Sequence, residues 1–240
     1  MKNLQLNPVF VKTKNVRNFE VMMDALELGA GEGRLGMVFG RAGRGKTRTS
    51  QWYAANNDCI YLRVATVWAT SQLDFLRALC RELEVLNPPK RKGPCFQEVV
   101  DRLVADPRPV FVDEIEKLPG AFLDLIRDLS DISCTPFVLV GEEELVAHMK
   151  KNRRVWSRAY QQLEFEPISV ADIIVYGQQA AGLRLDIPVA GILHSATDGD
   201  FRLVRRNMLS LVQMANAKGP DGPITPDMAK LAVKTGLTGK

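Results

Sequence analysis

Short apolar runs alternate with longer amphipathic segments along the chain up to Pro167. Each run has five to seven residues and is bounded mostly by glycine, proline or charged residues, a pattern that predicts buried β-strands. The five predicted strands cover residues 34–40, 59–65, 110–115, 136–141 and 162–166.

The segments between these runs have the spacing of helices. In residues 71–86, Leu73, Leu76, Leu79 and Leu83 recur every three or four positions, behind a serine that suits a helix N-cap. Helices are predicted at 47–55, 71–86, 95–105, 119–132, 142–151 and 153–160. Since strands alternate with helices, we expect an α/β fold with a five-stranded parallel sheet and helices on both faces.

The pattern changes after Pro167, where four helical segments follow one another without a strand, at 169–182, 188–198, 200–218 and 225–235. They predict a small all-α lid. The expected division of the chain is an N-terminal segment at 1–33, an α/β core at 34–166 and a helical lid subdomain at 167–240.

Composition narrows the class of protein. The 240 residues are 46% hydrophobic and 25% charged, which excludes a disordered chain, a collagen and a coiled-coil rod. No apolar run approaches the roughly 18 residues of a membrane span, and the N-terminus lacks a secretory signal, so we expect a cytoplasmic protein without a membrane partner. The four cysteines form no Cys-x-x-Cys pair and are expected to be buried and reduced. A net charge of +4 permits a polyanionic partner.

One glycine-rich segment between a predicted strand and a predicted helix fits a phosphate-binding loop, the Walker A motif. The motif G-x-x-x-x-G-K-[ST] is matched by Gly40, Arg41, Ala42, Gly43, Arg44, Gly45, Lys46 and Thr47. Backbone N–H groups of such a loop cradle phosphates, a lysine contacts the β- and γ-phosphates, and a threonine hydroxyl binds Mg²⁺. We expect these residues, with Arg48, to hold ATP, the alternative being a chance glycine-rich turn.

A second motif, Walker B, closes the strand at 110–115. Apolar residues lead into Asp113 and Glu114. In phosphoryl transfer an aspartate here holds Mg²⁺, and a neighbouring glutamate orients and deprotonates the attacking water. The pair therefore predicts an ATPase that forms ADP and phosphate, the alternative being two solvated acids at a strand end.

Phosphoryl transfer also needs positive charge on the γ-phosphate, and two arginines are candidates. Arg158 precedes the last predicted strand and can serve a neighbouring subunit. Arg202 opens a helix of the lid and can reach the nucleotide of its own chain. Either can instead be an ordinary surface arginine in a salt bridge.

Together these features resemble the AAA+ ATPases over about residues 10–236, so the implied fold is a P-loop AAA+ sheet followed by a helical lid. More narrowly, the chain is similar to the transposition ATPases, the family of the phage Mu B protein and TnsC. This narrower resemblance rests on residues 140–145, on 155–158 before 163–165, and on 195–199 before Arg202.

The resemblance implies a function. In such proteins ATP drives self-assembly into a helical filament on duplex DNA, the filament recruits a transposase, and hydrolysis disassembles it. It also implies that Arg158 is a finger acting in trans, that Arg202 is the second sensor, and that the N-terminal segment, with Val16 and Phe19, lies against the adenine. The location would be the cytoplasm of a bacterial host.

Two departures from the family pattern stand out. The first-sensor position after the fourth strand is occupied by Glu142, which cannot donate a hydrogen bond when ionised. Only 33 residues precede the first predicted strand, so we expect the ATPase body itself to hold DNA.

Two basic runs and one aromatic loop are the candidate DNA contacts, because phosphate contacts give affinity without sequence readout. The candidates are Trp68 in the loop 66–70, Lys90, Arg91 and Lys92, and Lys150 and Lys151. The alternative for each is a solvated charged loop. Two other functions stay open: a helicase-loader or initiator-like ATPase, and a nucleotide-gated interaction switch that binds no DNA.

Overall fold

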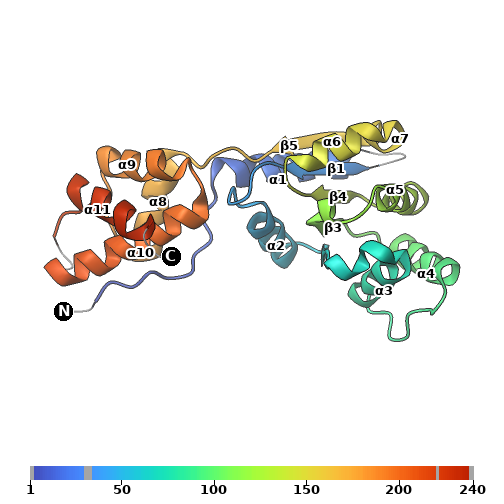
Figure 1. The fold of residues 1–240 in the computed structure, drawn as a ribbon. Helices are drawn as coiled ribbons and strands as arrows, with labels where there is room; N and C mark the ends of the chain where they lie inside the picture. The colour runs from blue at the N-terminus through green and yellow to red at the C-terminus, as the bar shows by residue number, and fades with distance from the viewer. Residues whose placement is uncertain (1–2, 30–33, 220–221, 238–240) are drawn as a thin grey trace. The chain divides into compact units, whose positions relative to one another are not determined.

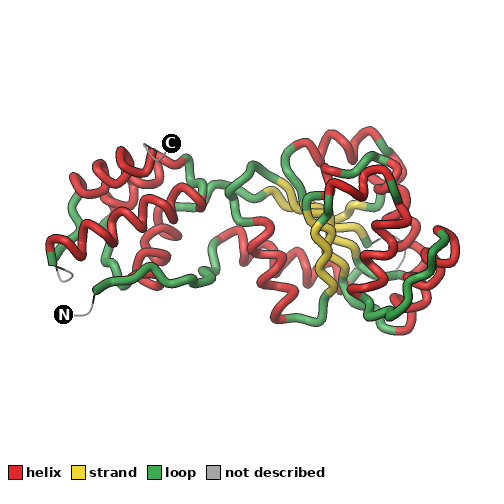
Figure 2. Tube along the Cα trace, turned by 60° about the horizontal axis from the view of Figure 1, so that its bottom comes forward, coloured by secondary structure: helices red, strands yellow, loops and turns green. Residues whose placement is uncertain are grey.

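The computed structural model describes residues 3–29, 34–219 and 222–237. Its centre is one parallel sheet with the strand order β2-β3-β4-β1-β5. The strands are β1 (Leu35–Phe39), β2 (Ile60–Arg63), β3 (Val110–Asp113), β4 (Phe137–Val140) and β5 (Ala159–Glu164). Figures 1 and 2 show the sheet flanked by helices, which confirms the predicted fold class.

The central strands β3 and β4 are buried on both faces because helices cover both sides of the sheet. All four residues of β3 and all four of β4 are buried. Successive side chains point to opposite faces, so Val110 and Val112 belong to one core and Phe111 to the other.

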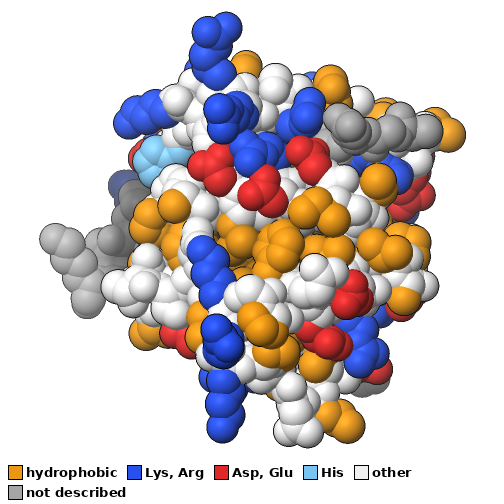
Figure 3. All heavy atoms as spheres, turned by 90° about the vertical axis from the view of Figure 1, so that its right-hand side faces the viewer, with side chains coloured by type: hydrophobic (Ala, Val, Ile, Leu, Met, Phe, Trp, Pro, Cys, Tyr) orange, Lys and Arg blue, Asp and Glu red, His pale blue; other side chains and the backbone are white. Residues whose placement is uncertain are grey.

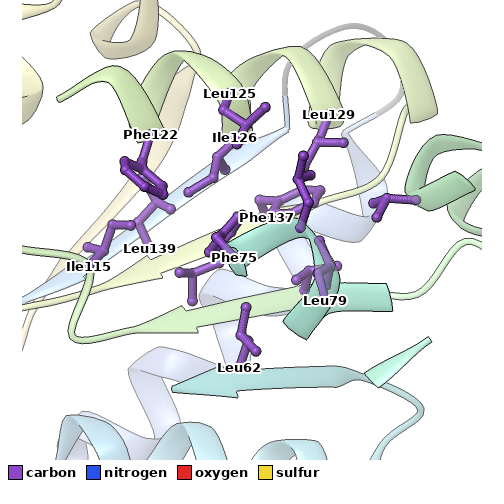
Figure 4. Packing of buried hydrophobic residues seen from close by; sticks show 14 of the residues in the cluster. Leu62, Phe75, Leu79, Ile115, Phe122, Leu125, Ile126, Leu129, Phe137 and Leu139 are labelled. Carbon is purple, nitrogen blue, oxygen red and sulfur yellow. The ribbon is translucent and has the colours of Figure 1, made fainter. Parts of the chain in front are cut away.

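The larger core lies under α3 (Gln72–Glu82), α4 (Lys92–Ala105) and α5 (Ala121–Ser133), with α6 (Glu144–Lys151) and α7 (Arg153–Trp156) beside them. Figure 4 shows Phe75 of α3 and Ile126 of α5 pointing at strand residues that include Phe137 and Leu139. The apolar side chains that recur with helical spacing in the sequence thus pack against the sheet.

The opposite face is covered by α1 (Lys14–Leu28) and α2 (Lys46–Asn56). Phe19 of α1 is fully buried, with its ring centroid 5.4 Å from that of Tyr53 and 5.8 Å from that of Phe111. We did not predict α1, although Phe19, Met22, Met23 and Leu26 carry a helical spacing that the sequence already contained.

The C-terminal part is entirely helical, as predicted. It consists of α8 (Val170–Ala181), α9 (Ile187–Thr197), α10 (Phe201–Lys218) and α11 (Pro226–Leu237). A capping box between Ser169 and Asp172 begins α8. These helices share their own core, against which the N-terminal Leu4 packs, and the Asn216 side chain bonds both backbone groups of Leu4.

The chain divides into two compact units. One contains Met1–Arg17, Ala42–Gly45 and Glu166–Lys240, and the other contains Asn18–Arg41 and Lys46–Phe165. We call them the lid unit and the sheet unit. The three consecutive functional segments read from the sequence stay a prediction.

Several local expectations needed correction. The predicted helix at 153–160 ends at Trp156, and β5 begins at Ala159 rather than at residue 162. A 3₁₀ helix, η1 (Thr66–Thr70), occupies the expected loop after β2. Cys80 and Cys95 are buried as expected, but Cys59 is only half-buried and Cys134 is exposed at the C-terminus of α5. Within the described ranges, no helix has the length and hydrophobicity needed to cross a bilayer.

Candidate nucleotide-binding site

The candidate site lies at one edge of the sheet. Because β2, β3, β4 and β1 are parallel neighbours, the segments that follow them emerge together. These segments carry Arg63 at the end of β2, Asp113 and Glu114 at β3, Glu142 after β4, and the glycine-rich loop after β1. In the sheet, β4 lies between β3, which ends in the Walker B pair, and β1, which leads into the Walker A loop. The two motifs therefore lie at the same edge of the sheet.

The glycine-rich loop has a backbone that requires glycine. Gly40, Gly43 and Gly45 have φ values of 133°, 80° and 97°, in the region that disfavours side chains. A Cβ on Gly40 would also lie 2.7 Å from the carbonyl oxygen of Phe165. These positions therefore let the loop curl tightly before α2 begins.

Lys46 is buried, with its ammonium directed back across this loop. Its Nζ donates to the carbonyl oxygens of Gly40, at 2.5 Å, and of Arg41, at 3.0 Å. The residue is 8% exposed. The loop thus positions one concentrated positive charge at its centre, as phosphate binding requires.

The middle of the loop belongs to the lid unit and contacts the turn between α9 and α10. The Arg44 side chain, 5% exposed, donates to the carbonyl of Asp198, and its Nη2 lies 3.0 Å from the Asp198 carboxylate. The N–H of Phe201 donates to the carbonyl of Gly43 over 2.9 Å. Sequence reasoning gave Arg44 only a place in the phosphate loop and missed this contact.

Asp113 is almost fully buried, at 2% exposure, and both its oxygens are held. One accepts the N–H of Glu114 at 3.0 Å, and the other accepts the Tyr61 hydroxyl at 2.6 Å. The carboxylate is therefore fixed in orientation by the strand and by its neighbour β2.

Glu114 adopts a left-handed backbone with φ of 61°, which turns its side chain sharply at the strand end. Its carboxylate accepts from Arg63 at 2.7 Å and from Lys117 on the opposite oxygen. Arg63 chiefly, and then Lys117, lower the pKa of Glu114 against the effect of partial burial. A carboxylate held in this way is a weak base until these cations release it.

A third acidic residue, Glu116, was not singled out from the sequence. Burial raises its pKa, and its Oε2 lacks a hydrogen-bond partner among the described residues. It lies beside Gly141, at which an added Cβ would meet Oε2 at 2.5 Å. Glu142, which follows Gly141, is exposed, and its place at the first-sensor position stays a prediction.

Thr47 and Asp113 offer the hydroxyl and carboxylate oxygens that Mg²⁺ prefers, so the donor set fits a magnesium ion. Protein sites of this kind use one or two carboxylates and complete the shell with phosphate oxygens and water. Within the described part of the chain, no cluster of three or more His, Cys, Asp or Glu side chains can hold a metal alone.

The two candidate arginines have different surroundings. Arg158 directly precedes β5, as predicted, and its Nε lies 3.4 Å from the carboxylate of Asp131. Arg202 is exposed in the first turn of α10, and its N–H donates to Asp200 over 2.7 Å. Their assigned roles as finger and second sensor stay predictions.

Val16 and Phe19, assigned to the adenine, are 3% and 0% exposed. Phe19 packs within the aromatic core beneath α1, so in this structure its side chain presents no surface to a ligand. A packing role accounts for Phe19, and the contact with adenine stays a prediction.

The first set of DNA candidates lies around α3 and α4. Lys90, Arg91 and Lys92 are exposed where the Pro-rich loop enters α4. Trp68 is half-buried, with its ring edge-on to Phe75 at 6.3 Å. It lines a pocket of about 400 Å³ whose other members include Arg63 and Arg81.

The second set lies at the end of α6. The ammonium of Lys150 lies 5.5 Å from the centre of the Trp156 ring. Lys151 lines a pocket of about 700 Å³ together with His148, Arg153 and Arg154. Figure 3 shows the end of the sheet unit near these elements, where basic side chains stand above and below an apolar band. The basic members of both sets are exposed and therefore accessible to a polyanion: Lys90, Arg91, Lys92, Lys150 and Lys151.

A comparison with protein families matches residues 30–149, half of the chain, to the AAA domain. The chain belongs to the AAA domain family. The match covers the glycine-rich loop, the Asp113–Glu114 pair and β4. Both motifs of this AAA chain therefore lie within the segment that matches the AAA domain.

Curated relatives of this AAA chain are named as a DNA transposition protein and a target DNA activator. It is 26% identical to the Mu-like prophage FluMu DNA transposition protein B of Haemophilus influenzae, over 82% of this chain and 70% of that one. It is 28% identical to the ATP-dependent target DNA activator B of Escherichia phage Mu, over 61% of this chain and 46% of that one. The chain thus spans less than half of the phage Mu protein.

Solved structures share the fold of this AAA chain. The ORC2 protein of Aeropyrum pernix, in ADPNP and ADP complexes, superposes with a TM-score of 0.69 at 16% identity, over all of this chain and 71% of that one. CDC6P of Pyrobaculum aerophilum gives a TM-score of 0.67 at 15% identity, over 98% of this chain and 71% of that one.

Proposed function

We propose that this chain is an ATP-hydrolysing AAA ATPase that assembles on duplex DNA without sequence preference and presents that DNA to a transposase. The observation that carries the proposal is the common sheet edge, where Lys46 and its loop follow β1 and Asp113 and Glu114 end β3. The names of the curated relatives, DNA transposition protein B and target DNA activator B, support the DNA and transposition parts.

In the proposed reaction the loop binds the ATP phosphates and Lys46 leaves its carbonyl partners for the β- and γ-phosphates. Thr47 and Asp113 would hold Mg²⁺, which when bound neutralises charge that develops on the phosphates. Glu114 then orients the attacking water and accepts its proton.

Glu114 cannot act as a base while two cations hold it. The proposed active state therefore separates its carboxylate from Arg63 and Lys117, which restores its basicity. Arg63 ends β2, and η1, which contains the DNA candidate Trp68, begins at Thr66. This placement supports a link between DNA contact and hydrolysis.

The proposed DNA contact is electrostatic. The three exposed cations Lys90, Arg91 and Lys92 would bind phosphates, and so would Lys150 and Lys151 at the second set. Contacts between these cations and phosphates carry no sequence information, which suits a protein that accepts many target sequences. Arg158, by the family resemblance, would complete the ATP site of a neighbouring copy.

The test is fluorescence anisotropy of a labelled random-sequence duplex, with and without a non-hydrolysable ATP analogue. We expect wild type to bind only with the analogue and Lys46→Ala not to bind, because it cannot retain the nucleotide. The triple change at 90–92 to alanine should weaken binding and lower the slope of log K against log salt by about 3, at roughly 0.9 for each phosphate contact.

The change of Lys150 and Lys151 to alanine is the matched comparison, since it removes charge from the other candidate surface. An unchanged affinity and salt slope in the triple variant would contradict the placement at 90–92. Analogue-dependent assembly of wild type that ignores DNA would favour a nucleotide-gated interaction switch instead.

A further inference from the structure

The Walker B aspartate has a partner that the sequence did not reveal. Tyr61 lies in the middle of β2, paired in register with Phe111 of β3, two residues before the pair Arg63 and Asp113. From there its hydroxyl reaches Oδ2 of Asp113 at 2.6 Å, a distance within the range of a charge-assisted hydroxyl–carboxylate hydrogen bond.

The Tyr61 hydroxyl is itself held from the other side. Nε2 of Gln51 donates to it over 3.3 Å. Gln51 lies on α2, the helix that begins with Lys46 and Thr47. A chain of two hydrogen bonds therefore joins the helix behind the phosphate loop to the carboxylate that ends β3, entirely within the sheet unit.

The proton of this phenol has a fixed direction. A tyrosine hydroxyl, with an ordinary pKa of about 10, carries its proton at neutral pH. Since the hydroxyl accepts from Gln51, its one proton is directed at Asp113. Asp113, accepting once on each oxygen, keeps further lone pairs for a ligand.

We propose that Tyr61 is a positioning residue for magnesium: its hydrogen bond fixes the Asp113 carboxylate in the orientation that holds the ion of Mg·ATP. The inference rests on the proposed ATPase function. Groups that orient a metal ligand from behind typically change metal affinity by 10–100-fold when they are removed.

The experiment is equilibrium binding of a fluorescent ATP analogue to the full chain, titrated with Mg²⁺ and repeated in EDTA. Tyr61→Phe should raise the Mg²⁺ concentration for half-maximal effect by about 10–100-fold. Binding in EDTA and the urea midpoint of the nucleotide-free protein should stay near wild type. Tyr53→Phe is the matched control, because Tyr53 is a buried phenol on α2 that forms no hydrogen bond with a carboxylate among the described residues.

A double variant distinguishes positioning from general loss of packing. In an Asp113→Asn background, Tyr61→Phe should add no further shift in the Mg²⁺ requirement. A Tyr61→Phe requirement within twofold of wild type would overturn the proposal, and so would a full shift that persists beside Asp113→Asn. Wild-type binding that is absent or independent of Mg²⁺ would contradict the proposed function itself, which is a separate outcome.

Discussion

The contact between Arg44 and Asp198 gives a sharp test of how the phosphate loop is built. Arg44→Met removes the guanidinium and keeps most of the apolar stem. Asp198→Asn removes the carboxylate but keeps a residue that tolerates the left-handed backbone, since Asp198 has φ of 49°. Both changes leave the Asp198 carbonyl and the surrounding turn in place.

The magnitude follows from the exposure of the two partners. Hydrogen bonds to charged groups contribute about 1.5–3 kcal/mol. The Arg44 side chain is 5% exposed, but that of Asp198 is 71% exposed, so the loss should fall below the roughly 3–5 kcal/mol of a fully buried pair. We expect local opening of the turn to become easier by about 1.5–3 kcal/mol in Arg44→Met.

The assay is native-state hydrogen exchange of the peptide around residues 200–204. The Phe201 N–H bonds to Gly43, so it reports the contact directly. A change of 1.5–3 kcal/mol corresponds to about 10–150-fold faster exchange, since about 1.4 kcal/mol is tenfold. Arg205→Met, an exposed arginine of the same helix, is the control and should exchange like wild type.

Asp198→Asn should speed exchange less than Arg44→Met, because it keeps the hydrogen bond from Arg44 to the Asp198 carbonyl. Added to Arg44→Met, it should change little, because Arg44→Met has already removed the ion pair. Exchange of Phe201 within twofold of wild type in Arg44→Met would refute this account. So would fully additive single effects, which would mean that the two side chains act independently.

Three further predictions concern acids and an arginine of the sheet unit. Glu114→Gln should bind ATP but hydrolyse it about 10²–10⁴-fold more slowly, and its DNA complexes should outlast removal of ATP; wild-type turnover would exclude Glu114 as the base. Arg158→Ala should bind nucleotide and fail to assemble cooperatively, measured by sedimentation with an ATP analogue; full assembly with full turnover would exclude a finger. Burial raises the pKa of Glu116. Glu116 therefore binds its proton more tightly in the folded than in the unfolded chain, and its ionisation lowers the stability of the fold as pH rises above the unfolded-state pKa. Glu116→Gln should therefore raise the unfolding temperature at neutral pH, with a difference that vanishes below about pH 4; a constant difference at all pH values would contradict it.

The parts of the fold that depend on local pattern were readable from the sequence. Buried parallel strands leave continuous apolar runs, and the phosphate loop leaves glycines at the positions where φ is positive, as at Gly43 and Gly45. The helix α1 is also readable, since Phe19 and Met23 have helical spacing.

The contacts that tune the site were not readable, because they join distant parts of the chain. Tyr61 meets Asp113 across 52 positions, and Arg44 meets Asp198 across 154. Glu114 has a left-handed backbone, which brings its carboxylate to Arg63. The residue types that usually indicate such a backbone, glycine and asparagine, are absent at this position. Such features depend on strand order and on packing, which the local pattern of a sequence does not reveal.

We propose that ATP binding makes this chain assemble on DNA. Electron microscopy with a non-hydrolysable ATP analogue, with and without random duplex DNA, tests it most directly. The account predicts filaments or stacked rings that require both the analogue and DNA. Assemblies that form equally well without DNA, or no assembly in either condition, would contradict it.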